Sequence, residues 1–155
     1  MENSNHFNVI VIGAGISGIG AGYYLKKNCP NKSFCIIEGR ENIGGTWDLF
    51  KYPGIRSDSD MFTLGYAFKP WKEQKTIANG PSILSYLEET VEENNLREKI
   101  KFSHKVLSAN WNSAERNWEV RAAHHEQEIL LTANFLFMGT GYYLSLIHIS
   151  EPTRR

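Results

Sequence analysis

A glycine-rich hexapeptide near the amino end constrains the fold of this chain more than any other feature. The sequence Gly13-Ala14-Gly15-Ile16-Ser17-Gly18 follows an apolar, β-branched run at residues 7–12 and opens a helical pattern at residues 16–28. A buried strand that enters a helix through GxGxxG is typical of dinucleotide-binding α/β domains. In order, the three glycines permit a tight turn, let the backbone approach a pyrophosphate, and allow close packing of helix on strand.

An acidic residue stands where such a site needs a ribose ligand. A second apolar run at residues 33–38 ends in Glu38, 20 residues after Gly18. We expect this carboxylate to accept hydrogen bonds from the adenosine ribose hydroxyls and to repel the 2′-phosphate of NADP, so the site should hold FAD or NAD. Arg40, two residues further on, is expected either to lie along the adenosine or to be an ordinary exposed side chain.

The remaining pattern predicts one α/β domain with a Rossmann-like parallel sheet, helices and an antiparallel β-meander. Residues 39–80 have little periodicity and are expected to form long loops that contact a ligand, with a short helix near residues 60–66. A longer helix should run from Pro81 to about residue 95. Strands are expected at residues 100–103, in a meander at 106–112, 118–122 and 128–131, and in a buried strand at 135–138.

Composition excludes several classes of partner. Lys plus Arg number 17 and Asp plus Glu number 17, so no net charge attracts the chain to nucleic acid or to an anionic membrane. The longest apolar stretch, residues 7–19, is interrupted by Asn8 and Ser17 and is shorter than the roughly 18 to 20 residues of a membrane span. Because the amino end also lacks the basic region of a signal peptide, we expect a cytoplasmic protein that binds small molecules.

Cysteine and histidine show no catalytic or metal-binding spacing. Cys29 and Cys35 form no CxxC motif, so a redox pair is not expected. The five histidines are scattered, and the adjacent His124 and His125 fall in an expected hairpin turn, where a metal site is rare. We therefore expect no metal centre.

The segment after the second strand carries a resemblance to a known family. Gly44-Gly45-Thr46-Trp47-Asp48 is followed by Tyr52-Pro53-Gly54 and then by Ser57-Asp58-Ser59-Asp60. Together with the first glycine motif these segments resemble the FAD-binding region of Baeyer-Villiger and flavin-containing monooxygenases, over roughly residues 8–143. An ordinary NAD dehydrogenase has no reason to carry GGTW after its second strand.

The resemblance implies a set of site residues. Gly45, Thr46 and Trp47 would lie beside the flavin, although Trp47 and Tyr52 are also suited to a core position over a loop. Asp58 would be the catalytic carboxylate that faces the flavin and pairs an arginine from a later part of the chain, whereas Asp60 is as readily a solvated acid. The family pattern also implies that the Val106 backbone reads the adenine edge, and that Gly139-Thr140-Gly141 returns the chain to the cofactor.

The implied activity is monooxygenation. NADPH would reduce the FAD, which would react with O2 to a C4a-peroxyflavin and transfer one oxygen atom to an organic ketone or heteroatom. Two alternatives stay open: an FAD-dependent NAD(P)H oxidoreductase that does not oxygenate, and a non-catalytic FAD-binding module.

The chain departs from the family after Tyr143. The second GxGxxG for NADPH, the linker fingerprint and the substrate-facing portion are absent from the sequence. We therefore expect an inactive fragment, incomplete relative to the two-dinucleotide-domain fold, with an FAD-binding domain at residues 1–143. Residues 144–155 resemble translated sequencing-adapter read-through and are expected to be a non-native or disordered tail.

Overall fold

The computed structural model describes residues 5–141, which form one six-stranded sheet with helices. The strands lie in the order β3-β2-β1-β6-β5-β4. β3, β2, β1 and β6 run parallel to one another, and β6, β5 and β4 pair antiparallel in succession. The strand bounds are β1 His6–Ile12, β2 Phe34–Ile37, β3 Ile100–Lys101, β4 His104–Asn112, β5 Asn117–His124 and β6 Gln127–Met138. The predicted fold class is therefore confirmed.

The first strand-helix-strand unit forms as its pattern predicts. α1 spans Ile16–Asn28 and ends just before Cys29, one residue ahead of Pro30. β1 and β2 pair in parallel from Val9 opposite Phe34 to Ile12 opposite Ile37. Both strands therefore end at the same edge, directly before the glycine motif and Glu38.

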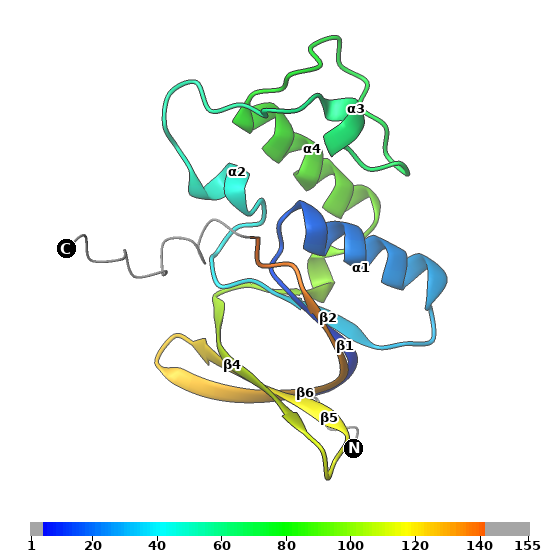
Figure 1. Ribbon diagram of the computed structural model, residues 1–155, viewed down its shortest axis with the longest axis vertical. Coiled ribbons are helices and arrows are strands. Elements are labelled where there is room, and N and C mark those ends of the chain that lie inside the picture. The colour runs from blue at the N-terminus through cyan, green and yellow to red at the C-terminus, as the bar shows by residue number, and fades with distance from the viewer. Residues whose placement is uncertain (1–4, 142–155) are drawn as a thin grey trace, which may run out of the picture.

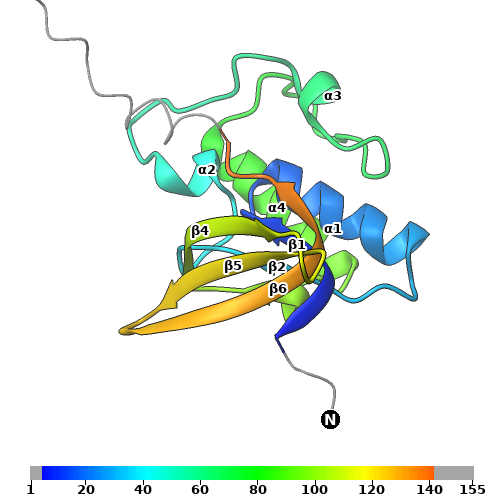
Figure 2. The ribbon, with the colours of Figure 1, turned by 60° about the horizontal axis from the view of Figure 1, so that its bottom comes forward.

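α1 and α4 cover one face of the parallel part of the sheet (Figures 1 and 2). α4 spans Gly80–Glu93, with Asn79 as its N-cap and Pro81 in its first turn. Its apolar stripe packs with α1 and with alternate residues of β1 and β2 in a single core cluster that includes Val11, Ile19, Ile36, Ile83, Leu87 and Val91.

The meander covers the opposite face (Figure 2). Ile10, Ile12 and Ile37 form a second core cluster with Val120 and Leu131 of the meander. β4 also returns to the end of β2, because the His104 amide donates to the Glu38 carbonyl at 2.9 Å. The central strands are thus buried on both faces, as their continuous apolar sequences predict.

The prediction of two separate strands near the carboxyl end of the domain is wrong. Residues 128–131 and 135–138 belong to one strand, β6, which pairs with β5 up to Ala133 and with β1 from Thr132 onward. The polar stretch Thr132-Ala133-Asn134 resembles a turn but stays extended, because both neighbouring strands pair with it. The expectation of a buried strand at 135–138 is also wrong, since Phe135 and Met138 are 69% and 62% exposed.

Most of residues 39–80 are irregular, as expected. Two single-turn helices occur there, α2 at Thr46–Leu49 and α3 at Met61–Leu64. The strand predicted at 100–103 is only two residues long and follows a short 3-10 helix at Arg97–Lys99.

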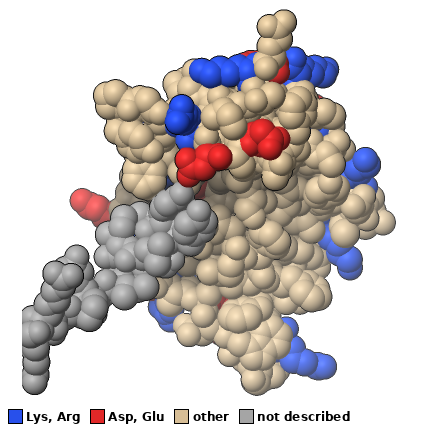
Figure 3. Space-filling model, turned by 45° about the horizontal axis from the view of Figure 1, so that its top comes forward, with Lys and Arg blue, Asp and Glu red and all other residues tan. Residues whose placement is uncertain are grey.

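Charged side chains do not gather on the face shown in Figure 3, where blue and red groups are scattered over a mostly uncharged surface. Within residues 5–141, no helix combines the length and the apolar character that crossing a bilayer would require.

Candidate functional site

A cavity of about 530 Å³ opens where β1 and β2 end and α1 begins. We call it the glycine pocket. Its walls come from the glycine motif, the end of β2, the turn before α2, the start of β4 and the residues after β6. Ten of the predicted site residues line it: Gly13, Gly15, Glu38, Arg40, Gly45, Thr46, Trp47, Val106, Thr140 and Gly141. Ligand sites of open α/β sheets lie in this crevice beyond the carboxyl ends of the strands.

The glycines of the motif are required by contact geometry. Gly13 has φ +99°, and a Cβ there would lie 2.5 Å from the Gly139 carbonyl oxygen. A Cβ on Gly18 would lie 1.8 Å from the Gly13 carbonyl oxygen, so Gly18 permits the close packing of helix on strand, although it does not line the pocket. These contacts also bring the Gly139-Thr140-Gly141 turn against the first motif.

The amino terminus of α1 is open to an anion. Gly15 is its N-cap, has no side-chain capping hydrogen bond, and is followed by no acidic residue in the first turn. The unpaired N–H groups and the partial positive charge at such a terminus favour a phosphate.

The Gly44-Gly45 turn lies directly on the glycine motif. The Gly44 amide donates to the Ala14 carbonyl at 2.9 Å. Both glycines have positive φ, +116° and +57°, and a Cβ on Gly45 would lie 3.0 Å from the Gly15 Cα. The two glycine segments therefore line one continuous backbone surface with no side chain between them, and this surface fits the pyrophosphate of a dinucleotide.

Glu38 has a second role that the sequence pattern did not indicate. It is buried, and its Oε2 accepts from the Ala14 amide at 2.8 Å while its Oε1 accepts from the amide and the Nε of Arg40 at 3.1 and 3.4 Å. A carboxylate offers about four acceptor positions. One position on Oε2 is left for a ribose hydroxyl, and the same side chain fixes the glycine loop.

The Arg40 side chain lines the pocket and also connects two segments of the chain. Its Nη2 donates to the Gly45 carbonyl at 3.0 Å, and its Nη1 lies 3.5 Å from Asp48 Oδ2. The guanidinium therefore links the end of β2 to the turn before α2. Asp48 was not anticipated as a site residue, because an aspartate in a loop is usually a solvated acid.

The two loop acids do not join this group. Asp58 is exposed and is not among the residues that line the glycine pocket. Asp60 is the N-cap of α3, and its carboxylate accepts from the Thr63 amide at 3.0 Å. That hydrogen bond lowers the pKa of Asp60, so the helix cap accounts for this residue.

His104 and Lys105 also line the pocket and were missed by the sequence pattern. The His104 ring stacks on His124 at 4.1 Å between centroids, and its Nδ1 lies 2.5 Å from the Phe102 carbonyl. Burial, together with the neighbouring His124, lowers the pKa of His104 below its ordinary value.

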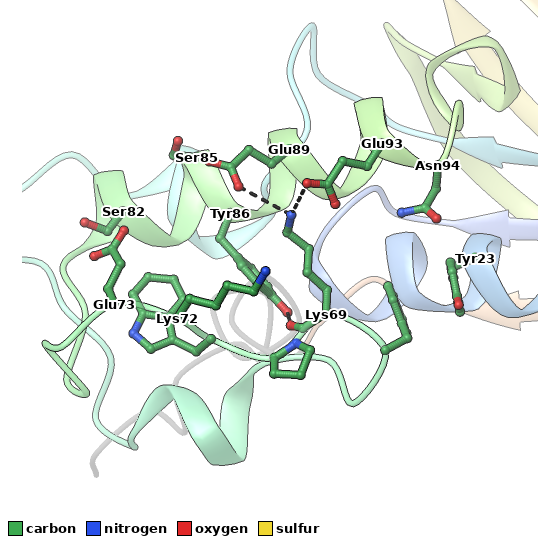
Figure 4. A pocket seen from close by; sticks show the side chains of 13 residues that line it. Tyr23, Lys69, Lys72, Glu73, Ser82, Ser85, Tyr86, Glu89, Glu93 and Asn94 are labelled. Carbon is green, nitrogen blue, oxygen red and sulfur yellow. Dashed lines mark hydrogen bonds and ion pairs between the residues drawn. The ribbon is translucent and has the colours of Figure 1, made fainter.

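A second cavity, of about 380 Å³, lies between α4 and the loop at residues 68–73. Figure 4 shows Lys69 inside it, directed at two carboxylates of α4. Lys69 Nζ lies 2.6 Å from Glu93 and 3.4 Å from Glu89, so the lysine already fills the position that a bound cation would take.

The described part of the chain contains neither a cysteine pair nor a cluster of metal ligands. Cys29 and Cys35 are free thiols, and burial raises the pKa of Cys35 to about 12. No group of three or more His, Cys, Asp or Glu side chains among residues 5–141 is arranged to hold a metal ion.

Comparison with known proteins agrees with this geometry. Residues 11–73 match the family described as NAD(P)-binding Rossmann-like domain. The chain is 52% identical over 140 residues to the FAD-containing monooxygenase EthA of Mycolicibacterium smegmatis, covering 90% of this chain and 28% of that protein.

Solved structures of monooxygenases are also similar to this chain. OTEMO in complex with FAD and NADP has a TM-score of 0.77 and 31% identity, over 87% of this chain and 26% of that one. The open structure of cyclohexanone monooxygenase has a TM-score of 0.80 and 29% identity, over 89% of this chain and 27% of that one. The resemblance predicted from the glycine and GGTW segments is confirmed, and the chain spans less than a third of the relatives it matches.

Proposed function

We propose that the glycine pocket binds FAD, because nine-tenths of this chain matches an FAD-containing monooxygenase. The observation that carries the proposal is the meeting of three groups in one cavity: the glycine loop, the uncapped amino terminus of α1, and Glu38. The first two suit a pyrophosphate, and Glu38 retains an acceptor position for a ribose hydroxyl.

The chain's own residues have separate tasks in this proposal. Gly13, Gly15 and Gly45 keep side chains away from the pyrophosphate, and the α1 terminus supplies N–H donors. The Val106 backbone and the Thr140-Gly141 turn border the adenosine and the entry to the flavin end. Trp47 offers a broad aromatic surface beside that end.

We also propose that the longer protein to which this segment corresponds is a flavin-dependent monooxygenase. FAD, once bound, would supply the redox chemistry, with NADPH as reductant and with O2 and an organic ketone or heteroatom compound as substrates. Asp58 is proposed to lie near the flavin there. Its exposure in this chain leaves it free to meet a basic partner.

The FAD proposal is tested by fluorescence titration of the 155-residue chain. Adding the wild-type chain should change the intensity or the polarisation of FAD fluorescence until the signal reaches a plateau. Glu38→Ala should weaken binding by about ten- to a hundredfold, since it removes roughly 1.5 to 3 kcal/mol of hydrogen bonding to a charged group. Glu41→Ala is the matched control, because Glu41 is exposed and lies outside the pocket. Absence of FAD binding by wild type would refute the proposal.

Oxygenation is tested on a full-length relative that contains this segment. NADPH oxidation in the presence of isotopically labelled O2 should transfer one labelled atom to a ketone or sulfide product. Electron transfer to an acceptor without label in the product would favour the reductase alternative.

A further inference from the structure

The guanidinium of Arg40 joins two walls of the glycine pocket, the end of β2 and the turn before α2, to Asp48, which lies outside the cavity. Its Nε contacts Glu38, its Nη2 donates to the Gly45 carbonyl, and its Nη1 faces Asp48. The Arg40 carbonyl also accepts from the Ser103 amide at 2.9 Å, which fixes the arginine backbone against the turn before β4.

Asp48 is the second carboxylate that pairs with this guanidinium, beside Glu38. The Asp48 side chain is 11% exposed, against 72% for Lys51, its other partner. Arg40 Nη1 is buried and has no hydrogen-bond partner among the described residues, and Asp48 Oδ2 lies 3.5 Å away. A buried guanidinium N–H is costly to leave uncompensated, and the carboxylate of Asp48 offsets this cost at Nη1, as that of Glu38 does at Nε.

The parts that the guanidinium joins are walls of the pocket. Gly45 lies against Gly15 and precedes Thr46 and Trp47 in the first turn of α2, and Glu38 holds the Ala14 amide. Asp48 itself does not line the cavity and belongs to neither core cluster. The Asp48 backbone amide contacts the Gly45 carbonyl at 3.3 Å, whereas its side-chain carboxylate reaches the walls of the pocket through Arg40.

We propose that Asp48 is a positioning residue for the dinucleotide site, which holds Arg40 where it fixes Glu38 and the Gly44-Gly45 turn together. This inference rests on the proposed binding of FAD. A neutral side chain at position 48 lets the guanidinium leave Gly45, and the turn and Glu38 then lose their common support.

The test is a double-mutant cycle in FAD titrations of the 155-residue chain. Asp48→Asn keeps the size of the side chain and should raise the Kd for FAD by roughly fivefold or more, because it removes the negative charge that faces Arg40 Nη1. Asp48→Glu keeps the carboxylate and should restore binding to within about twofold of wild type. In an Arg40→Met background, Asp48→Asn should change the Kd no further.

Lys51→Met is the matched control, because it removes the exposed partner of Asp48 and leaves Arg40 untouched; its Kd should equal that of wild type. If wild type binds FAD and Asp48→Asn binds it equally well, this inference fails and the proposed function stands. The inference also fails if Asp48→Asn weakens binding to the same extent after Arg40 has been replaced. If wild type itself does not bind FAD, the proposed function fails.

Discussion

Gly15 and Gly18 belong to one motif but have different surroundings, so their substitutions should have different effects. At Gly15 a Cβ would meet the Gly45 backbone at ordinary contact distances, 3.4 Å from Cα and 3.8 Å from N, and the residue has a negative φ of −84°. At Gly18 a Cβ would lie 1.8 Å from a backbone oxygen. The first position constrains the ligand, and the second constrains the fold.

We therefore expect Gly15→Ala to lower the free energy of unfolding by less than about 1 kcal/mol, a helix N-cap effect. The same variant should raise the Kd for FAD roughly tenfold or more, because its methyl group occupies space needed by the pyrophosphate. Gly18→Ala should lower the free energy of unfolding by more than about 2 kcal/mol. Urea denaturation and FAD titration measure the two quantities, and equal loss of stability in both variants would contradict this assignment.

His104 should make stability depend on pH. Its pKa in the folded chain is lowered below 6.5, by burial first and then by His124, Lys101 and His125, against the opposing hydrogen bond to the Phe102 carbonyl. The unfolded chain binds the proton more tightly, so unfolding takes up a proton and the free energy of unfolding falls as the pH falls below about 6.5.

His104→Phe keeps a ring against His124 and removes the titration. We expect its free energy of unfolding to fall less than that of wild type between pH 7 and pH 5, as measured by urea denaturation at intermediate pH values. Identical pH dependence in the two proteins would show that His104 does not contribute.

Most site residues were predictable because glycine motifs and a terminal acid have fixed places in this fold. The contacts that hold these residues in place could not be predicted from the sequence. Asp48 and Arg40 are eight positions apart in an irregular segment, and only the folded turn brings their side chains together. Asp58 is the opposite case. The family resemblance implied a role for this residue, but in the structure it is exposed and does not line the pocket.

Among the elements, one phenol of α4 links the helix to the loop that precedes it. The Tyr86 hydroxyl accepts from the Tyr66 amide at 2.7 Å and donates to the Lys69 carbonyl at 2.6 Å, and Tyr86 is 5% exposed. Tyr66 in turn donates to the Ile16 carbonyl at 2.5 Å, in the first turn of α1 beside the glycine pocket.

Tyr86→Phe should lower the free energy of unfolding by about 1 to 3 kcal/mol, because two partner groups lose their hydrogen bond. Tyr24→Phe is the control, since Tyr24 is 47% exposed, and it should change stability little. Equal stability of Tyr86→Phe and wild type in urea denaturation would contradict this role.

Element boundaries were the weaker part of the sequence prediction. The sequence pattern identified both long helices. α4 buries one apolar stripe in the core, whereas α1 buries Ile19 together with its glycines and leaves Tyr24 exposed. β6 was divided in two because it changes partners along its length, from β5 to β1, and a local pattern carries no information about pairing. Phe135 and Met138 of this strand are apolar, as in a buried strand, but both are exposed.

At the scale of the whole molecule, apolar surface lies exposed beside α1. A groove of about 660 Å³ is lined by Tyr24, Leu25 and Phe137 among others, and Phe135 lies two residues from Phe137 on the same face of β6. Exposed apolar area of this kind favours association. We expect the isolated chain to self-associate as its concentration rises, and Phe135→Ser to reduce this in sedimentation velocity, whereas a wild type that stays monomeric would contradict the expectation.

The binding of FAD in the glycine pocket is tested most directly by mapping the ligand on the protein. Two-dimensional amide spectra of the labelled chain, recorded during FAD titration, should show the largest shifts at Gly13, Gly15, Gly45 and Val106. The amides of Trp71 and Glu89, at the separate cavity beside α4, should stay unmoved. Shifts that gather at that cavity, or no shifts at saturating FAD, would contradict the account.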